Sequence, residues 1–154
     1  MLDYLVRPIG VVRASRSAAI DDDWDEVDSA IDLDPAVVSG EATLGLADFS
    51  HVEVLYLFHL VEPKGICTGA RHPRGRADWP LTGILAQRAK DRPNRLGVTV
   101  CRLLGADDLT IRVRGLDAID GTPVLDVKPY MSGFAPRGPV MEPAWAEELM
   151  ADYW

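Results

Sequence analysis

Hydrophobic and polar residues alternate along several stretches of this chain, which is the period of a β-strand with one buried face. In residues 51–60, HVEVLYLFHL, one face carries bulky apolar side chains: Val52, Val54, Tyr56 and Phe58. The opposite face begins with polar side chains and becomes apolar toward its end. We therefore predict a strand that is covered on both sides near its carboxyl end.

The longest alternating region, residues 97–116, reads GVTVCRLLGADDLTIRVRGL. It contains two runs with the period of a strand, separated by turn-forming residues at 105–108. In the second run, Ile111 and Val113 alternate with arginines. This pattern predicts an antiparallel hairpin.

Shorter alternating segments predict further strands at residues 6–13, 40–46, 81–88 and 124–127. Asp120 and Gly121 supply a tight turn before the last of these strands. Residues 19–35, AIDDDWDEVDSAIDLDP, are acidic and have no regular period, so we expect a long loop there.

Helical periodicity is confined to the end of the chain. Pro143 fits the first turn of a helix, and Trp145, Leu149 and Asp152 follow at helical spacing. Short strands closed by Gly and Pro turns indicate a mainly β fold, a small single-domain barrel or sandwich with long loops and a short C-terminal helix. A Rossmann sheet is disfavoured because crossover helices and a glycine-rich turn after the first strand are both missing.

The composition fits one domain over residues 1–154, with 47% hydrophobic residues to build its core. No apolar run is long enough to cross a membrane and no signal peptide precedes the first strand, so we expect a soluble cytoplasmic protein. Cys67 and Cys101 lack the spacing of a zinc site or a redox pair, and we expect Cys101 to be buried. His51 and His72 have no second His at ligand spacing, so no metal is expected.

The net charge of −8 argues at first against a nucleic-acid partner, because Lys and Arg contacts to phosphate supply most non-specific affinity. The charge is segregated, however. Residues 64–102 hold nine basic and two acidic side chains and carry +7, so the remainder carries −15. Within this segment, RHPRGR at residues 71–76 is either an ordinary solvated surface or a mobile loop that meets an anionic partner, with RNA the leading candidate.

Two polar segments carry the candidate chemistry, and the first is DRPNRLG at residues 91–97. It places Arg92 and Asn94 beside turn-forming residues, which is how loops expose hydrogen-bonding groups to a ligand. We predict that Arg92 and Asn94 bind substrate. The alternative is a structural turn, in which Asn94 caps backbone donors and Arg92 pairs with Asp91 or Asp126.

The second polar segment is DGTPVLDVKPY at residues 120–130. Its alternation puts Asp126, Lys128 and Tyr130 on one face of an extended stretch that ends at Pro129. A carboxylate, an ammonium and a phenol on one face form a polar site, and we predict a functional role for all three. The alternative is that Asp126 and Lys128 form only an ion pair.

Four blocks of the sequence, in order, resemble the TsaA-like family, also called TrmO: IGVVR at 9–13, LADFSHVEVLYLFHL at 46–60, GILAQRAKDRPNRLGVTV at 83–100 and GLDAIDGTPVLDVKPY at 115–130. Characterised members of that family use S-adenosylmethionine to methylate N6 of threonylcarbamoyl-adenosine beside the tRNA anticodon, at position 37. The resemblance implies a β-barrel, S-adenosylmethionine as cofactor, tRNA as partner and a homodimer with sites near the subunit interface.

Matched position by position, the resemblance implies a cofactor site made of His59, Leu60, Arg88, Val98, Gly121, Thr122, Pro123 and Val124. Arg88 would offer a planar fork of donors, and Gly121 would allow close backbone approach. For methyl transfer, we expect Asp126 to orient the site and Lys128 or Tyr130 to contact the acceptor.

The chain departs from the family pattern in its first long loop, where AIDDDWDEVDS replaces a Pro-Arg-Gln stretch, and at Gln87 and Arg95, which stand where the family has Thr and Pro. We also expect it to lack the additional carboxy-terminal domain of longer bacterial members. Two alternatives to a tRNA methyltransferase therefore stay open. One is methyl transfer to a small-molecule acceptor, and the other is a non-catalytic module that binds S-adenosylmethionine.

Overall fold

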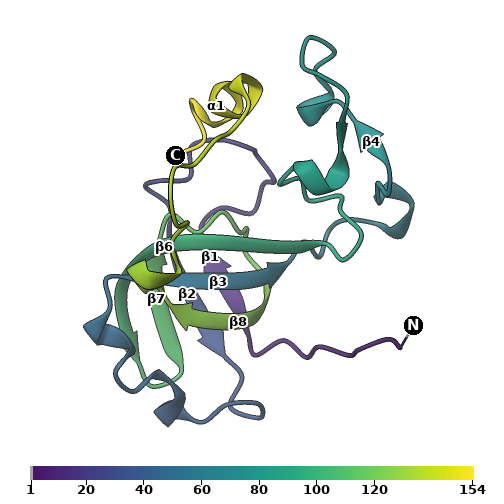
Figure 1. Cartoon of the computed structure of the whole chain (residues 1–154). Helices are drawn as coiled ribbons and strands as arrows, with labels where there is room; N and C mark the ends of the chain where they lie inside the picture. Colours follow the sequence, from purple (N-terminus) through teal and green to yellow (C-terminus); the bar gives the residue numbers. More distant parts are fainter. Residues whose placement is uncertain (1) are drawn as a thin grey trace.

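Six antiparallel strands close into a barrel in the computed structural model, which describes residues 2–154 (Figure 1). The order around the barrel is β1-β2-β7-β6-β3-β8. The strands are β1 (Gly10–Ala14), β2 (Asp28–Leu33), β3 (His51–Leu57), β6 (Leu96–Asp107), β7 (Thr110–Arg114) and β8 (Pro123–Pro129). Closure leaves the barrel without a free edge, and the expected mainly β barrel is confirmed.

The barrel interior is filled by the alternate side chains of each strand. On β3, Val52, Val54 and Tyr56 are buried, which confirms the face predicted from the alternation. Ile111 and Val113 of β7 join the same core, and the expected burial of Cys101 is also confirmed.

The expectation of a continuous irregular loop over residues 19–35 is wrong, because β2 lies inside it. Ser29, Ile31 and Leu33 point into the barrel, while Asp28 and Asp32 face outward. The acidic side chains occupy the solvent side of an ordinary half-buried strand. Their density hid the period of two that the buried residues follow.

The predicted strand at residues 40–46 is not formed, and the one predicted at residues 81–88 is reduced to two residues. Residues 40–46 form a 3-10 turn, Gly40–Thr43, and the start of a second one, Leu46–Asp48; Gly45 between them has a φ of 78°. Residues 81–88 contain only the two-residue strand β5 (Thr82–Gly83), which pairs with β4 (Ala70–Arg71). Short windows that contain glycine carry little periodic signal, so alternation there is weak support for a strand.

The ends of two other elements differ from prediction. β1 begins at Gly10 rather than at residue 6. The hairpin of β6 and β7 turns at Asp108 and Leu109, and β6 continues through the positions expected to form the turn. A register shift near Gly105 allows this, because an extra residue on one strand bends the ladder without ending it.

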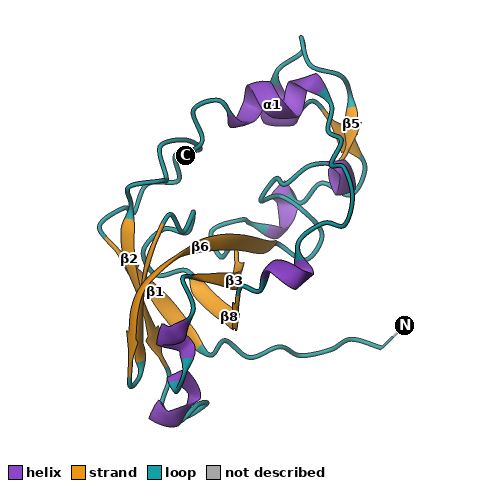
Figure 2. Ribbon diagram, turned by 60° about the vertical axis from the view of Figure 1, so that its left-hand side comes forward, coloured by secondary structure: helices purple, strands orange, loops and turns teal. Residues whose placement is uncertain are grey.

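A second, smaller body lies above the barrel and is formed by the chain between β3 and β6 (Figure 2). It contains β4, β5 and short 3-10 turns around the buried side chains of Pro73, Trp79 and Ile84. The expected C-terminal helix, α1 (Ala144–Met150), packs beside this body: the Trp79 indole donates to the Glu148 carboxylate at 2.7 Å.

The chain after α1 returns to the barrel. Backbone amides of Asp23 and Trp24 donate to the carbonyls of Asp152 and Tyr153, at 3.1 and 3.0 Å. The last residues therefore fasten the loop before β2. None of the helices described within residues 2–154 has the length and apolar character needed to cross a membrane.

Candidate functional site

Strand register brings the predicted cofactor residues to one end of the barrel. β3 pairs with β6 on one side, where Leu55 lies opposite Val98, and with β8 on the other, where Tyr56 lies opposite Val124. Because the strands are antiparallel, His59 and Leu60 leave the end of β3 where the turn before β8 arrives. Segments that are far apart in sequence thus meet at this end.

Arg88 reaches this barrel end from the smaller body. Its guanidinium donates to the Val98 carbonyl at 2.5 Å and is otherwise exposed. Leu60 exposes 64% of its surface, while His59 and Val98 are half-buried. These groups form a partly apolar rim with an arginine fork whose remaining donors face solvent.

The turn at residues 121–124 completes the predicted cofactor set. Gly121 has a φ of 79°, and no atom lies within 4 Å of the position that a Cβ would take. Thr122 and Val124 are buried, at 3% and 0% exposure, so their side chains belong to the barrel interior. Gly121 and half-buried Pro123 are therefore the members of this turn that a ligand can reach.

The predicted catalytic residues lie on the outer face of β8 and just beyond its end. A bulge on β8 between the partners of Leu55 and Tyr56 moves Asp126 from the inward to the outward side of the strand. Asp126 then lies opposite Leu55, and Lys128 lies opposite Glu53. The Tyr130 amide donates to the His51 carbonyl at 2.9 Å, which continues the same row.

Asp126 and Lys128 form the ion pair that was the alternative interpretation of this segment. The hydrogen bond from Lys128 to Asp126, and then the charge of Asp126, raise the pKa of Lys128 above its ordinary value. Lys128 is therefore a cation at neutral pH and cannot act as a base there. The side chains of Asp126 and Lys128 remain 43% and 57% exposed, so both can still meet a ligand.

The Arg-Pro-Asn segment forms a tight turn. The Arg95 amide donates to the Arg92 carbonyl at 2.9 Å, and Arg95 has a φ of 53°. The pairing of Arg92 with Asp91 or Asp126, which belonged to the alternative interpretation, is not formed: Arg92 donates to the Gln87 carbonyl at 2.9 Å. Asn94 is exposed at the tip of the turn, where a substrate can reach it.

The acidic loop before β2 neutralises part of the basic segment. Arg74 makes a bidentate contact with Asp22, with N···O distances of 2.6 and 3.1 Å. Nearby, Arg71 binds Asp91 at 2.7 Å. Trp24 is buried at 4% exposure beneath the Arg16 guanidinium, so its ring is not open to a ligand.

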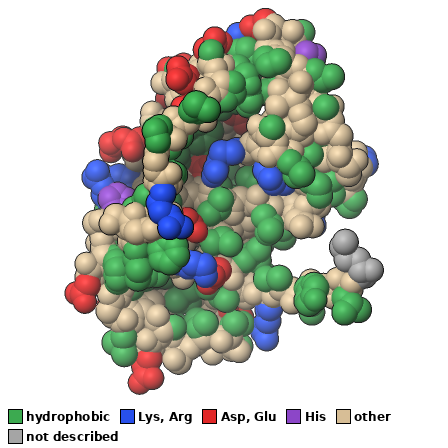
Figure 3. All heavy atoms as spheres, viewed as in Figure 1, with side chains coloured by type: hydrophobic (Ala, Val, Ile, Leu, Met, Phe, Trp, Pro, Cys, Tyr) green, Lys and Arg blue, Asp and Glu red, His purple; other side chains and the backbone are tan. Residues whose placement is uncertain are grey.

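Five cations of residues 64–102 have no carboxylate partner among residues 2–154: Arg88, Lys90, Arg92, Arg95 and Arg102. On the face shown in Figure 3, Lys and Arg side chains lie in the hollow between the barrel and the smaller body. The unpaired cations of the segment therefore lie outside the RHPRGR loop, whose three arginines are paired with carboxylates. Such a surface can attract a polyanion.

Sequence reasoning missed a hydroxyl cluster around Asp117 at the same barrel end. Tyr56 donates to the Asp117 carboxylate at 2.7 Å, and Thr99 and Tyr153 donate to it as well. Burial, followed by the charge of Asp117, raises the pKa values of Tyr56 and Tyr153 well above their ordinary range. Both phenols are neutral donors at physiological pH. The sequence signal for this cluster was Tyr56, a residue with a polar hydroxyl on the predicted buried face of β3.

No group of three or more His, Cys, Asp or Glu side chains within residues 2–154 is arranged to hold a metal ion. The site as described is an arginine fork, a glycine turn with open space beside Gly121, and a polar row on the outer face of β8. These groups can bind a polar organic ligand by hydrogen bonds and position a second one beside it.

Comparison with known proteins gives consistent matches. The profile of the tRNA-methyltransferase O N-terminal domain family matches residues 19–135. A probable S-adenosyl-L-methionine-binding protein of Methanothermobacter thermautotrophicus is 38% identical over 133 residues, which cover 84% of this chain and 91% of the relative. The human tRNA (adenine(37)-N6)-methyltransferase is 37% identical over 100 residues, or 65% of this chain and 22% of the human protein.

Among solved structures, TrmO from Pseudomonas aeruginosa superimposes with a TM-score of 0.74 at 30% sequence identity. The alignment covers 91% of this chain and 61% of that one. The chain therefore spans nearly all of the archaeal relative but less than two thirds of the solved protein.

Proposed function

Since the chain belongs to the tRNA-methyltransferase O N-terminal domain family, we propose that it is an S-adenosylmethionine-dependent methyltransferase that acts on N6 of threonylcarbamoyl-adenosine at tRNA position 37. The observation that carries this proposal is the meeting of the family-matched segments at one barrel end, beside unpaired cations. The names of the human and archaeal relatives, a tRNA adenine methyltransferase and a probable S-adenosylmethionine-binding protein, support the acceptor and the cofactor.

The residues present fit S-adenosylmethionine. The open space beside Gly121 admits a ligand close to the backbone, and exposed Leu60 offers an apolar contact. Arg88 has free donors for a carboxylate or a ribose. His59, Val98 and the turn at residues 121–124 would complete the contacts. The cofactor supplies a methyl group on a positively charged sulfur, so the protein mainly has to align the acceptor and exclude water.

We assign the polar row to the acceptor. Asp126 holds the Lys128 ammonium in place, and Lys128 or Tyr130 hydrogen-bonds the incoming nucleoside. An exocyclic adenine amine is a weak nucleophile, so its orientation toward the methyl group matters more than a strong base. Arg92 and exposed Asn94 contact the RNA at the edge of the site.

We also propose that the protein works as a homodimer in the cytoplasm, where tRNA serves translation. Large apolar side chains remain uncovered at the amino-terminal arm and in the stretch before α1: Leu2, Tyr4, Leu5, Val6, Phe134, Val140 and Met141. Apolar surface of this extent favours association. A second copy would cover it.

Variants of the polar row test the catalytic assignment. Asp126→Asn and Lys128→Gln should each lower the rate of methyl transfer by about 10- to 1000-fold, as the loss of positioning contacts does. Their S-adenosylmethionine affinity, measured by calorimetry, should stay unchanged. Asp32→Asn, which removes a carboxylate paired with Arg13 on another side of the barrel, is the matched control. Transfer rates equal to wild type in both variants would remove these residues from the mechanism.

The choice of acceptor is tested with labelled S-adenosylmethionine and two cell fractions, tRNA and small metabolites. Label in tRNA supports the leading proposal. Label only in the metabolite fraction would favour a small-molecule methyltransferase, and tight cofactor binding without transfer to either fraction would favour a binding module.

A further inference from the structure

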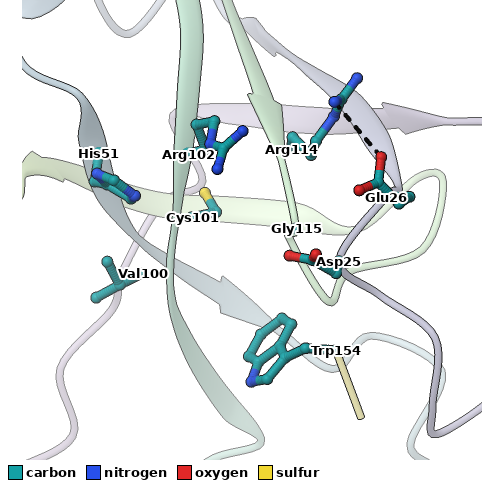
Figure 4. A pocket seen from close by; sticks show the side chains of 9 residues that line it. All are labelled: Asp25, Glu26, His51, Val100, Cys101, Arg102, Arg114, Gly115 and Trp154. Carbon is teal, nitrogen blue, oxygen red and sulfur yellow. Dashed lines mark ion pairs between the residues drawn. The ribbon is translucent and has the colours of Figure 1, made fainter. Parts of the chain in front are cut away.

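A pocket of about 170 Å³ lies on the outside of the barrel, beside β6 and β7 and beneath the last residue of the chain (Figure 4). Its lining is mixed in charge and includes the indole ring of Trp154. The polar side chains that line it are Asp25, Glu26, His51, Arg102 and Arg114. Neither the family-matched cofactor set nor the polar row contains these side chains. The size suits one small planar group rather than a whole cofactor.

The pocket continues the outer face that carries the polar row. Arg102 on β6 lies opposite His51 on β3, and the Tyr130 amide donates to the His51 carbonyl at 2.9 Å. Val98, at the cofactor end, precedes Arg102 by four residues on the same strand, which is about 13 Å at the usual rise of a strand. A ligand that extends beyond the polar row therefore arrives at this pocket.

Two charges in the pocket are available to a ligand. Arg114 is already bound, to Asp28 at 2.6 Å and to Glu26 at 3.6 Å. Arg102 and Asp25, in contrast, have no ion pair or side-chain hydrogen bond with any residue in the range 2–154. The pocket thus offers one free cation and one free hydrogen-bond acceptor.

Trp154 forms a wall of the pocket and leaves 49% of its surface exposed. The rings of Trp154 and Tyr153 form a T-shaped pair with centroids 5.0 Å apart. Tyr153 is itself anchored by hydrogen bonds to Asp117 and Trp24. In the view of Figure 4, Asp25 lies between Trp154 and Arg114, and Arg102 lies toward His51. Bases of single-stranded RNA commonly stack on an aromatic ring whose position is fixed and that lies beside an arginine.

We propose that this pocket binds a nucleotide that flanks the methylated one, with its base against Trp154, its phosphate at Arg102 and a base amino group at Asp25. The proposal rests on the function proposed above, since it assumes an RNA acceptor. A carboxylate accepts a hydrogen bond from the amino group of cytosine or adenine, whereas uracil presents an acceptor there. The pocket therefore prefers an amino-bearing base.

The test is calorimetric titration of the full chain with CMP, AMP and UMP. We expect CMP and AMP to bind at least about fivefold more tightly than UMP. Trp154→Ala and Arg102→Gln should each weaken CMP binding by about tenfold. Asp25→Asn should reduce the preference over UMP. Arg13→Gln, which removes an arginine from β1 on another side of the barrel, should change nothing.

Several outcomes overturn the proposal. Equal affinity for the three nucleotides, or unchanged CMP binding in both Trp154→Ala and Arg102→Gln, excludes it. A parallel loss of S-adenosylmethionine affinity in Trp154→Ala would assign the pocket to the cofactor's adenine instead. CMP binding that depends on Trp154 and Arg102, in a protein that transfers no methyl group, would support the pocket while contradicting the proposed methyltransferase.

Discussion

At the residue scale, three hydroxyl groups from separate parts of the chain converge on the Asp117 carboxylate. Tyr56, Thr99 and Tyr153 donate to it from β3, β6 and the chain after α1. Tyr56 is 1% exposed, and its ring lies so close to Gly97 that a Cβ there would come within 2.4 Å of it. The cluster therefore joins the barrel interior to the end of the chain.

Replacing Tyr56 with Phe tests this cluster. Loss of a buried hydrogen bond to a charged group should lower the free energy of unfolding by about 1 to 3 kcal/mol, measured by urea denaturation at pH 7. Thr82→Val, which removes an exposed hydroxyl bonded to the Pro80 carbonyl, is the control and should cost much less.

The same variant should change the pH dependence of stability. The pKa values of Tyr56 and Tyr153 are raised in the folded protein, so the neutral phenols favour folding. This contribution is complete below the unfolded pKa of about 10 and is lost as the pH rises above it. Wild-type stability should fall above pH 10, and less steeply in Tyr56→Phe. Identical slopes would contradict the assignment.

Arg88 carries the cofactor prediction at this scale. Arg88→Ala should weaken S-adenosylmethionine binding by about 1 to 3 kcal/mol in calorimetry, the typical contribution of a charge-assisted hydrogen bond. Lys90→Ala removes a nearby exposed charge and should leave the affinity unchanged. Equal affinities of wild type and Arg88→Ala would exclude Arg88 from the cofactor site.

At the element scale, the ion pair between Arg74 and Asp22 links the basic RHPRGR loop to the acidic loop before β2. Asp22→Asn should loosen Arg74 and make it more available to phosphate, because only the longer contact to Asp21 at 4.0 Å then remains. Affinity for tRNA should then rise, and the dependence of log K on log salt should steepen by up to about 0.7 per added contact, measured by fluorescence anisotropy.

Asp32→Asn is the matched control for this change. It also breaks an arginine pair, with Arg13 at 3.2 Å, but on β2, which lies across the barrel from β3. Tighter binding in both variants would show a general effect of net charge. No change in Asp22→Asn would mean that Arg74 does not meet RNA.

The elements that were predictable from the sequence are those whose alternation is long, β3 and the hairpin of β6 and β7. β2 was missed because outward aspartates dominate its composition, and residues 40–46 were misassigned because glycines weaken the periodic signal. The positions of the site residues depend on how β3 is aligned with β6 and β8, which the sequence of one strand does not specify. The bulge that turns Asp126 outward, and the contact of Asp117 with Tyr56 across 61 positions, leave no local pattern in the sequence.

At the scale of the whole molecule, uncovered apolar side chains at both ends of the chain argue for a second copy. Leu5 and Met141 are 100% and 93% exposed. Light scattering of the purified protein should give the mass of a dimer, and Leu5→Lys together with Met141→Lys should shift it toward the monomer. A monomeric wild type at micromolar concentration would contradict the homodimer.

The central claim is that this barrel transfers a methyl group from S-adenosylmethionine to tRNA. The most direct measurement incubates the protein with labelled S-adenosylmethionine and bulk tRNA from cells lacking its gene, followed by nucleoside mass spectrometry. We predict label on threonylcarbamoyl-adenosine. Absence of label from every nucleoside, with cofactor binding intact, would contradict the claim.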